Sequence, residues 1–311
     1  MPDKQPRLIL FNGEILEYDQ ARVHVNIPAL GFAANVIESL RGYWNATKQE
    51  LYIFRLKDHL HRLVQTMNLC KIPGHGDIHR YAEDVLRIVR AGEFREDIQI
   101  VIKALIEKPD GTLLAVNPTE PATVVMFARP MGRMVQAEGM HCQISSWIRP
   151  SDHSMPLRAK AAANYHNSRL AEYQARIDGY DTAILLNSQG NVTEGTAYNI
   201  FMVRHGALIT PLVTDGILEG VTRDTLITLA SRKMGLSVQE RSIDRTELYV
   251  ADELFFCGSA AEVTPILSVD RQQIGNGETG PLTGRTRESY FSIVRGEVAD
   301  ELKWLTPVTN R

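Results

Sequence analysis

Lys160 and Glu194 are the two residues of this chain whose types and surroundings best suit covalent and acid–base chemistry. Lys160 lies in PLRAKAAANYHNS, where three alanines follow it, so that nothing long shields its amine from a flat partner. Glu194 lies in LLNSQGNVTEGTAYNIF, in a Gly-rich turn between two apolar strands. A lysine amine can bond to a carbonyl carbon, and a carboxylate can pair with a protonated ring nitrogen. Together they predict a site for a flat cofactor that carries both groups.

Pyridoxal phosphate is such a cofactor, and its phosphate needs hydrogen-bond donors elsewhere in the chain. The segment DGILEGVTRDTL offers a turn at Gly220 and Thr222 as the expected N-cap of a helix. Helix-start amides attract anions, although a capped surface helix would have the same sequence. A second turn, FFCGSAAEVTP, places Ser259 and further amides after a strand, as an ordinary strand-to-loop transition also would. Two such turns favour a phosphate site more than either alone.

Arg55 is a third candidate for the phosphate. It ends an expected strand just before a helix, in YIFRLKDHL. From that position a guanidinium can bind a phosphate through two parallel hydrogen bonds. A surface ion pair with Asp58 explains the same residue, and taken alone the segment favours the ion pair.

Two further patterns indicate no activity. Residues 275–280, GNGETG, fit the string G-x-G-x-x-G, but no strand-turn-helix unit of the dinucleotide-binding kind surrounds them. Because Pro281 follows directly, these residues predict a hairpin turn. Ser145 and Ser146 lack the G-x-S-x-G setting of a hydrolase nucleophile.

A pair of histidines has the spacing of metal ligands without the surroundings. His75 and His79 are four residues apart and flank Asp77. Gly74 and Gly76 work against a stable helix that would hold both rings on one metal ion. The sequence therefore predicts no metal site.

The composition is that of an ordinary globular protein with room for two domains: 311 residues, 44% apolar, 23% charged, and a formal net charge of −3. No basic excess suggests nucleic acid, and no apolar run approaches the roughly 18 residues of a membrane span. The start, MPDKQPRLILFNGEIL, lacks the apolar region of a signal peptide. Cys70, Cys142 and Cys257 form no CxxC pair, which fits a reducing compartment. We expect a soluble cytoplasmic protein that binds neither nucleic acid nor membrane.

The first part of the chain predicts a mixed strand-and-helix unit. RLILFNGEIL predicts a hairpin that closes at residues 12–13, and LYIFRL predicts a strand. LKDHLHRLVQTMNL predicts a helix with Leu56, Leu60, Leu63 and Met67 on one stripe, and HRYAEDVLRIVRAG predicts a second helix that ends at Gly92. IQIVIKALIE and ATVVMFA are continuously apolar, which is typical of strands in the middle of a sheet.

The second part follows a break in the pattern at RPMGRMVQAEG, which predicts an interdomain loop able to close over a ligand. It opens with HCQISSWIRP and continues with a long helix after Lys160 and the hairpin DTAILLNSQGNVTEGTAYNIFMV. The strand ALITP, the helix TRDTLITLASRKMG, the segment LYVADELFFCG, a further hairpin and the helix TGRTRESYFSIV follow. We expect an α+β chain with domains at residues 1–128 and 140–311, joined by a loop at 129–139.

Five motifs carry a resemblance to a known family. FRLKDHLHRL, RAKAAANY, ILLNSQGNVTEGTAYNIF, ILEGVTRDTL and LYVADELFFCGSAAEVTPI, in this order and spacing, resemble the fold-type IV aminotransferases that use pyridoxal 5'-phosphate. Within that group the chain is most similar to branched-chain amino acid aminotransferases, from about residue 8 to the C-terminus. The resemblance implies a smaller N-terminal α/β domain and a larger β-barrel-like C-terminal domain with helices. It also implies a homodimer whose site lies in the interdomain cleft and is completed by the partner subunit.

The resemblance assigns roles by position. Lys160 would bond covalently to the cofactor and later, as a free amine, move the proton between the substrate Cα and the cofactor carbon. Tyr165 would donate a hydrogen bond to the phenolic oxygen of the cofactor, and Glu194 would pair with the pyridine nitrogen. Leu218 would pack on one face of the ring. The phosphate would be held by Arg55, Val221, Thr222 and Ser259, the last standing where the family usually has Thr.

The substrate side departs from the family pattern. Branched-chain enzymes usually have a Tyr at the position of Phe32, and a Phe-Glu-Gly where this chain has residues 37–39. They often have Tyr-x-Arg on the central strand, where residues 100–102 are Ile-Val-Ile, and an aromatic hydroxyl in the loop that here offers Arg133 and Met134. The changes predict a more apolar pocket, with Arg133 as a new cation. The candidate pocket residues are Phe32, Ile37, Ser39, Ile100, Ile102, Arg133, Met134 and Ala260.

Two enzyme activities fit these residues. The first is transfer of an amino group between a branched-chain or other hydrophobic L-amino acid and a 2-oxo acid. The second is an (R)-selective amine transaminase, whose donor has no α-carboxylate to bind and which uses pyruvate or another 2-oxo acid as acceptor. A related lyase or a non-catalytic protein of the same fold would also share the motifs. Intact Lys160, Glu194 and phosphate turns argue against a non-catalytic protein.

Overall fold

The computed structural model describes residues 5–74, 76–107, 120–132 and 138–309. The chain forms two compact units, which are described separately below. Two segments of the expected C-terminal domain, residues 159–163 and 293–311, belong to the first unit, and the domain boundaries at residues 128 and 139 stay a prediction. Unit 1 comprises Met1–Gly132, Ala159–Ala163 and Ile293–Arg311, and unit 2 comprises Arg133–Arg158 and Asn164–Ser292.

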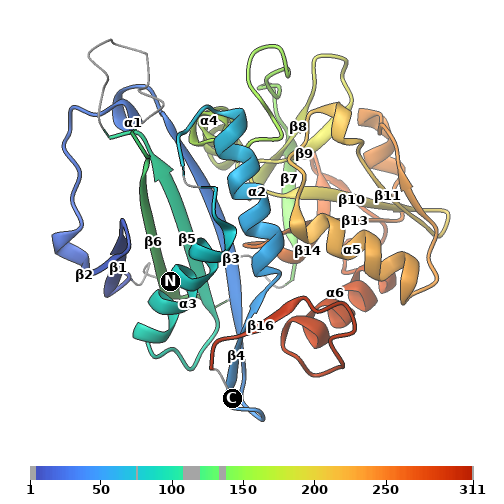
Figure 1. Cartoon of the computed structure of the whole chain (residues 1–311). Helices are drawn as coiled ribbons and strands as arrows, with labels where there is room; N and C mark the ends of the chain where they lie inside the picture. The colour runs from blue at the N-terminus through green and yellow to red at the C-terminus, as the bar shows by residue number, and fades with distance from the viewer. Residues whose placement is uncertain (1–4, 75, 108–119, 133–137, 310–311) are drawn as a thin grey trace. The chain divides into compact units, whose positions relative to one another are not determined.

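Unit 1 is built on a seven-stranded sheet in the order β16-β4-β3-β5-β6-β1-β2, in which every neighbouring pair is antiparallel. The hairpin at residues 12–13 is confirmed, and the two apolar strands, β5 and β6, lie inside the sheet as expected. Figure 1 shows these strands. Their bounds are β1 Leu8–Phe11, β2 Glu14–Glu17, β3 Asn35–Asn45, β4 Glu50–Phe54, β5 Ile98–Leu105, β6 Thr123–Pro130 and β16 Leu305–Pro307.

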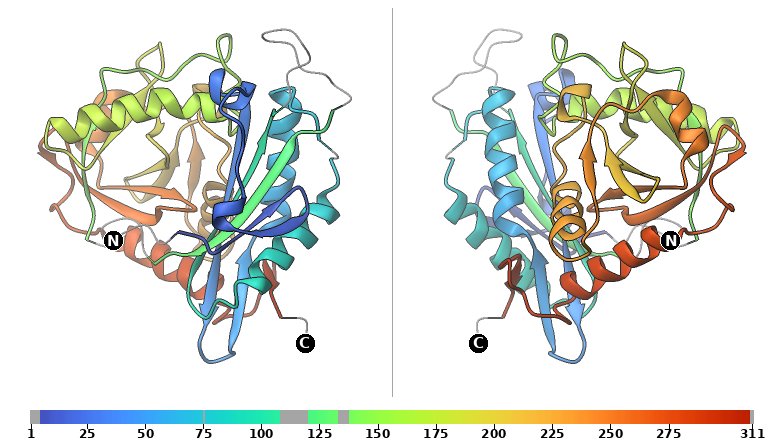
Figure 2. Two further views of the ribbon diagram at one scale, coloured as in Figure 1. Left: turned by 90° about the vertical axis from the view of Figure 1, so that its left-hand side faces the viewer. Right: turned by 90° about the vertical axis from the view of Figure 1, so that its right-hand side faces the viewer.

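Helices α2 (Leu56–Leu69) and α3 (Ile78–Ala91) cover one face of this sheet (Figure 1 and Figure 2). The apolar stripe of α2 is buried, as its spacing predicts, and it packs with α3 and the sheet in the core of unit 1. The predicted bounds of α2 are confirmed, and α3 ends before Gly92 as expected. The unit also contains the one-turn helix α1 (Pro28–Gly31) and the 3-10 turn η1 (Tyr18–Gln20).

Unit 2 contains a closed ring of strands in the order β10-β13-β14-β7-β8-β9. The ring closes because β9 pairs with both β8 and β10, the second pairing joining Glu194 to Asn199. Strands β11 and β12 extend the sheet beyond β10, and β15 pairs with β14. The strand bounds are β7 Met140–Ile144, β8 Thr182–Leu186, β9 Val192–Gly195, β10 Asn199–Arg204, β11 Ala207–Thr210, β12 Val238–Glu240, β13 Glu253–Gly258, β14 Glu262–Val269 and β15 Gln272–Gln273.

Three helices in the described part of the chain accompany this ring. The predicted helices after Lys160 and at the C-terminal motif are confirmed, and the helix predicted at TRDTLITLASRKMG is present but ends at Arg232. The loop at residues 275–280 differs from the expected hairpin turn, because it leads from β15 directly into α6. The amides at the start of α6 are already occupied, since the Glu253 carboxylate accepts the backbone N–H groups of Leu282 and Thr283 at 2.9 and 2.7 Å. The helices are α4 Ala162–Ile177, α5 Val221–Arg232 and α6 Pro281–Val294, with 3-10 turns η2 Val213–Asp215 and η3 Arg245–Val250.

Two kinds of feature are missing from the described part of the chain. No helix in it has the length and apolar character needed to cross a membrane. Its histidine, cysteine and acidic side chains form no group suited to holding a metal ion, and of the expected pair of histidines, His75 lies outside the described residues.

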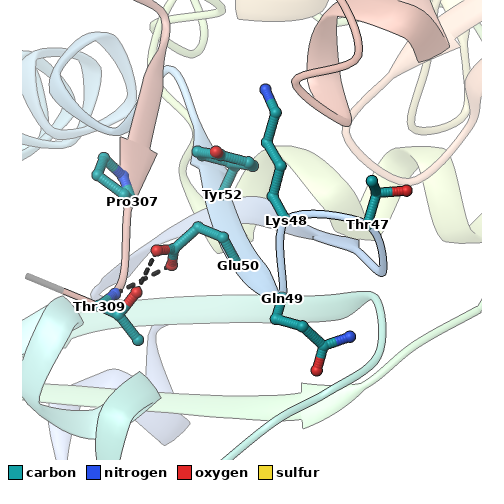
Figure 3. Close-up of a pocket in the computed structure, with 7 residues that line it drawn as sticks. All are labelled: Thr47, Lys48, Gln49, Glu50, Tyr52, Pro307 and Thr309. Carbon is teal, nitrogen blue, oxygen red and sulfur yellow. Dashed lines mark hydrogen bonds between the residues drawn. The ribbon is translucent and has the colours of Figure 1, made fainter. Parts of the chain in front are cut away.

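Within unit 1, a buried carboxylate fastens the C-terminal strand. Figure 3 shows Glu50 pointing at Thr309 beside a pocket of about 640 Å³ that Lys48 and Tyr52 also line. Oε1 of Glu50 accepts the backbone N–H groups of Val308 and Thr309 at 3.1 and 3.0 Å, and Oε2 accepts the Thr309 hydroxyl. These three donors tie the end of the chain to the β3–β4 hairpin.

Replacing Glu50 by Gln should loosen this end of the chain, because an amide nitrogen cannot accept the donors that a carboxylate oxygen accepts. We expect a loss of about 1–2 kcal/mol in the free energy of unfolding. Hydrogen exchange measured by mass spectrometry should become faster in the peptide that contains Val308 and Thr309. The exposed Glu297→Gln change is the control, and unchanged exchange in Glu50→Gln would contradict this role.

Candidate active site

Glu194 lies in β9 at the closure of the ring, and its side chain is only 8% exposed. Its Oε2 accepts hydrogen bonds from Asn199 Nδ2 at 2.9 Å and from the backbone N–H of Leu218 at 3.1 Å. Its Oε1 forms an ion pair with Arg149, with 2.8 Å between Nη2 and Oε1. A buried carboxylate requires partners of this kind, and here three donors fix its orientation. The ring therefore presents a fixed, buried anion.

Asn199 links this anion to the start of helix α5. Its Nδ2 also donates to the Leu218 carbonyl oxygen at 2.9 Å. A Cβ atom placed on Gly220 would lie 1.9 Å from Asn199 Oδ1, so only glycine allows this approach. The residues that orient Glu194 and the turn that leads into α5 therefore form one packed structure.

The start of α5 corrects one expectation. Gly220, not Thr222, is the N-cap residue, because the backbone of Gly220 is still extended and the helix begins at Val221. Thr222 lies in the first turn and is 3% exposed. Among the described residues no side chain caps this helix start. The amides of the first turn and the Thr222 hydroxyl are the groups that an anion would meet.

The second expected phosphate turn joins β13 to β14. It forms a hairpin turn between the paired residues Gly258 and Glu262, and Ser259 and Ala260 in it are half-buried. Thr264 stabilises the turn by donating its hydroxyl to the Ala261 carbonyl oxygen at 2.6 Å. The turn places backbone amides and one hydroxyl together, as the sequence indicates.

Two other cofactor candidates also lie in unit 2. Tyr165 is in the first turn of α4 and is half-buried. Leu218 lies in the loop before α5, half-buried, and its main chain bonds to both Glu194 and Asn199. Glu194 and Leu218 are thus in direct contact.

Lys160 belongs to the short segment that unit 1 takes from the middle of the chain. Its backbone N–H donates to Thr66 Oγ1 at 3.2 Å, and its carbonyl oxygen accepts the N–H of Ile37 at 3.0 Å. The flanking Ala159 and Ala161 are buried in the core of unit 1 at 2% and 4% exposure. Of the three alanines that follow Lys160, Ala161 therefore serves as a core residue, and the half-buried Lys160 is held between β3 and α2.

A buried polar cluster that sequence analysis missed lies beside this segment. Glu38 is fully buried in β3, and Arg62 donates to it from Nε at 2.9 Å and from Nη2 at 2.7 Å. His59 Nδ1 lies 3.0 Å from Glu38 Oε1. The available signal was the spacing of His59, Arg62 and Thr66, which places three polar residues beside the apolar stripe of one helix.

The pKa values in this cluster are shifted. Burial alone would raise the pKa of the Glu38 carboxyl, but Arg62 and His59 outweigh burial and hold that pKa well below its ordinary value of 4.5. Burial also lowers the pKa of His59 below 6.5, although Glu38 opposes this change. In the contact between His59 and Glu38, Nδ1 is the donor because the carboxylate can only accept.

Arg55 stands at the N-cap of α2 with a left-handed backbone, φ 50° and ψ 43°. Its Nε donates to Asp58 at 2.7 Å, and its guanidinium lies 4.9 Å from the centre of the Trp304 ring. The ion pair that the sequence favoured is therefore present, although the Arg55 side chain is only 9% exposed.

The substrate-pocket residues do not all lie on one face of the sheet. Ile37 and Ser39 share a face of β3, whereas Ile100 and Ile102 are fully buried in the core on the opposite face. The alignment of residues 100–102 with Tyr-x-Arg therefore placed two core residues in the pocket, because neighbouring side chains on a strand alternate between faces. Gln99 occupies the face of Ser39, and its Nε2 donates to Ser39 Oγ at 3.0 Å.

The remaining pocket candidates are less constrained. Phe32 follows α1 and is 49% exposed, and Ala260 lies in the β13–β14 turn. Arg133 and Met134 lie outside the described residues. Arg129, at the end of β6, donates from Nε and Nη2 to Gln99 Oε1 at 3.0 and 2.8 Å, so that Ser39, Gln99 and Arg129 form one polar chain that the sequence did not predict.

Replacing Glu38 by Gln should destabilise the protein by about 3–5 kcal/mol, because Arg62 would keep a buried charge without its carboxylate. Since the folded pKa of Glu38 is lowered, its contribution is present above the ordinary value of 4.5 and is lost as the pH falls through the folded value. Urea unfolding of wild type and variant should therefore differ most near pH 7 and converge in acid. The exposed Glu83→Gln change is the control, and a difference independent of pH would contradict the shift.

Comparisons with known proteins identify the family of this chain. The sequence profile of the amino-transferase class IV family matches residues 35–269. The probable branched-chain-amino-acid aminotransferase of Aquifex aeolicus is 38% identical over 97% of this chain and 96% of that protein. The branched-chain-amino-acid aminotransferase of Escherichia coli (strain K12) is 35% identical over 99% of each.

Solved structures give the same result for the fold. The branched-chain aminotransferase from Thermoproteus uzoniensis with norvaline matches with a TM-score of 0.93 and 40% identity, over 98% of this chain and 100% of that one. The branched-chain amino acid aminotransferase from Thermobaculum terrenum in its PLP form matches with a TM-score of 0.92 and 40% identity, over 99% and 100%. The predicted fold-type IV architecture is confirmed, and the chain belongs to the amino-transferase class IV family.

Proposed function

We propose that this chain transfers the amino group of a branched-chain or other hydrophobic L-amino acid to a 2-oxo acid with pyridoxal 5'-phosphate as cofactor. The observation that carries the proposal is the buried carboxylate of Glu194, held by three donors in a family whose members are aminotransferases. The names of the relatives support the substrate class, since both relatives and both structures described above are branched-chain aminotransferases. No observation favours the amine transaminase over this activity.

The donor set of unit 2 fits the cofactor. A protonated ring nitrogen requires a fixed carboxylate, which Glu194 provides. A phosphate requires several N–H and O–H donors, and the start of α5 provides Thr222 and backbone amides without a capping side chain among the described residues. The turn at Ser259 adds a hydroxyl and further amides. Both ends of the cofactor thus have chemically matching groups in one unit.

When bound, pyridoxal phosphate acts as an electron sink for the bond broken at the substrate Cα. Glu194 keeps a positive charge on the ring nitrogen favourable, with Arg149 and Asn199 fixing its orientation. Lys160 would hold the cofactor through its side-chain amine, and its free amine would move the proton at the substrate Cα. Tyr165 donates a hydrogen bond to the phenolic oxygen of the ring.

The other roles follow the family pattern. Leu218 would lie against one face of the ring. Phosphate oxygens would accept hydrogen bonds from Arg55, Val221, Thr222 and Ser259. For Arg55 this role must coexist with its ion pair to Asp58.

The substrate pocket is proposed from a smaller set than the sequence indicated. Ile37 and Ser39 lie on the face of β3 opposite the core, and Ile100 and Ile102 are removed because they lie in that core. An apolar side chain of the substrate fits Phe32 and Ile37. The other proposed members are Ala260, Arg133 and Met134.

We also propose that the active form is a homodimer. The support is a group of exposed apolar side chains in unit 1, where Val25, Leu30 and Phe32 are 80%, 61% and 49% exposed. Exposed apolar groups of this kind are typical of surfaces that a partner covers.

Lys160→Ala should abolish the transfer of the amino group from L-leucine to 2-oxoglutarate, with a fall in kcat of about 10³-fold or more, because no other group can move the Cα proton. The fold should survive, since the change leaves the backbone bonds to Thr66 and Ile37 in place. A steady-state assay and a circular dichroism melting curve check both points. Lys57→Ala on the exposed side of α2 is the control, and a Lys160→Ala enzyme that still turns over would contradict the assignment.

Gly220→Ala should weaken cofactor binding by about tenfold, because the new methyl group would displace the Asn199 amide from Glu194 at a cost of roughly 1–3 kcal/mol. A Cβ at this position meets Asn199 Oδ1 at 1.9 Å. Titration of the cofactor-free protein with pyridoxal phosphate measures the Kd. Gly284→Ala in α6 is the matched control, since nothing lies within 4 Å of its Cβ. Equal Kd values in the two variants would show that the contact between Asn199 and Glu194 does not support cofactor binding.

A further inference from the structure

A short segment around Lys160 is attached to a different unit from the chain on either side of it. Residues 159–163 belong to unit 1, whereas the residues before and after them belong to unit 2. Within unit 1 the segment is held by the isolated bridge between Val36 and Ala161 and by the two backbone hydrogen bonds of Lys160. The position of the Lys160 backbone therefore depends on β3 and α2.

The two partners of the Lys160 main chain come from these two elements. Ile37 of β3 donates its N–H to the Lys160 carbonyl oxygen at 3.0 Å. Thr66 of α2, which is fully buried, accepts the Lys160 N–H on its hydroxyl oxygen at 3.2 Å. A valine at position 66 would have nearly the same shape as the threonine. Packing therefore does not require the Thr66 hydroxyl.

The buried cluster joins the same two elements next to these contacts. Glu38 follows Ile37 in β3, and its carboxylate accepts two hydrogen bonds from Arg62 of α2, at 2.9 and 2.7 Å. His59 of α2 adds a third contact at 3.0 Å, and the Ser39 N–H a fourth at 2.9 Å. Replacing a buried ion pair of this kind by neutral residues often leaves stability unchanged or raises it, so stability alone does not account for the cluster.

We propose that Thr66 and the Glu38–His59–Arg62 cluster are positioning residues for Lys160. The cluster fixes the spacing of β3 and α2, and Ile37 and Thr66 use that fixed spacing to hold the Lys160 main chain on unit 1. The charge of Lys160 is among the groups that lower the pKa of His59, which agrees with its place near the cluster. This inference rests on the proposed role of Lys160.

The test compares Thr66→Val, which removes the hydroxyl, with Thr66→Ser, which keeps it. Thr286→Val is the control for loss of a buried threonine hydroxyl, because Thr286 is 1% exposed in α6. Among the described residues its hydroxyl makes only a weak hydrogen bond, to Met234 Sδ at 4.0 Å. Full-length, cofactor-free protein is mixed with pyridoxal phosphate, and samples are quenched with borohydride over time. Mass spectrometry then measures the fraction of Lys160 that carries the reduced cofactor, and melting curves give each Tm.

We expect Thr66→Val to slow attachment at Lys160 by about fivefold or more, the effect of leaving a buried donor without its acceptor. Thr66→Ser should stay within about twofold of wild type, and Thr286→Val should not differ from it. The Tm of Thr66→Val should fall no further than that of Thr286→Val. Attachment in Thr66→Val at the wild-type rate, or equal slowing in Thr66→Ser, would overturn the proposal.

A double change tests the cluster separately and covers the case in which Thr66→Val does not fold. Glu38→Gln with Arg62→Gln removes both charges and keeps two groups that can bond to each other. Attachment at Lys160 should slow by about threefold or more while the Tm is maintained, and an unchanged rate would overturn the role of the cluster. Label on a lysine other than Lys160 in the wild-type protein would instead overturn the proposed function.

Discussion

The ion pair and two hydrogen bonds that hold the Glu194 carboxylate are the constraint on which unit 2 depends. Glu194 pairs with Asn199 at the point where the ring of strands closes, and its side chain bonds to the Asn199 amide as well. Asn199 in turn requires a glycine at position 220, where α5 begins. Ring closure, the carboxylate proposed to pair with the ring nitrogen and the turn proposed to bind the phosphate are therefore a single packing arrangement.

Unit 1 also contains a buried carboxylate that several donors hold in place. Its core contains the fully buried carboxylate of Glu38, which is stable there only because Arg62 and His59 surround it. Burying this cluster costs desolvation free energy, which apolar residues at the same positions would not require. Glu38 directly follows Ile37, whose backbone N–H donates to the Lys160 carbonyl oxygen. We therefore relate the buried cluster to the proposed role of Lys160.

Local patterns were sufficient to predict much of the fold. The bounds of α2 follow from its apolar stripe, and the inner strands β5 and β6 follow from their continuous apolar character, because each signal depends only on near neighbours in the chain. The closure of the ring could not be predicted, since the pairing of β9 with both β8 and β10 is decided by three-dimensional packing.

The candidate site divides in the same way. Lys160 and Glu194 stand out by their neighbours in sequence, but Arg149 and Thr66 do not, because each acts through a partner distant in the chain. The placing of Ile100 and Ile102 in the pocket has a simple cause. Gln99 and Lys103 alternate with isoleucines in β5 and so mark the face away from the core, but the alignment with Tyr-x-Arg did not use this alternation.

A half-reaction without acceptor tests the central claim, the transfer of an amino group from a branched-chain amino acid, most directly. The cofactor-loaded protein is mixed with L-leucine in one sample and with (R)-1-phenylethylamine in another, and the visible absorbance of the bound cofactor is followed. The account predicts rapid loss of absorbance with leucine and little change with the amine. Loss with the amine alone would contradict it and would identify a pocket that does not bind an α-carboxylate.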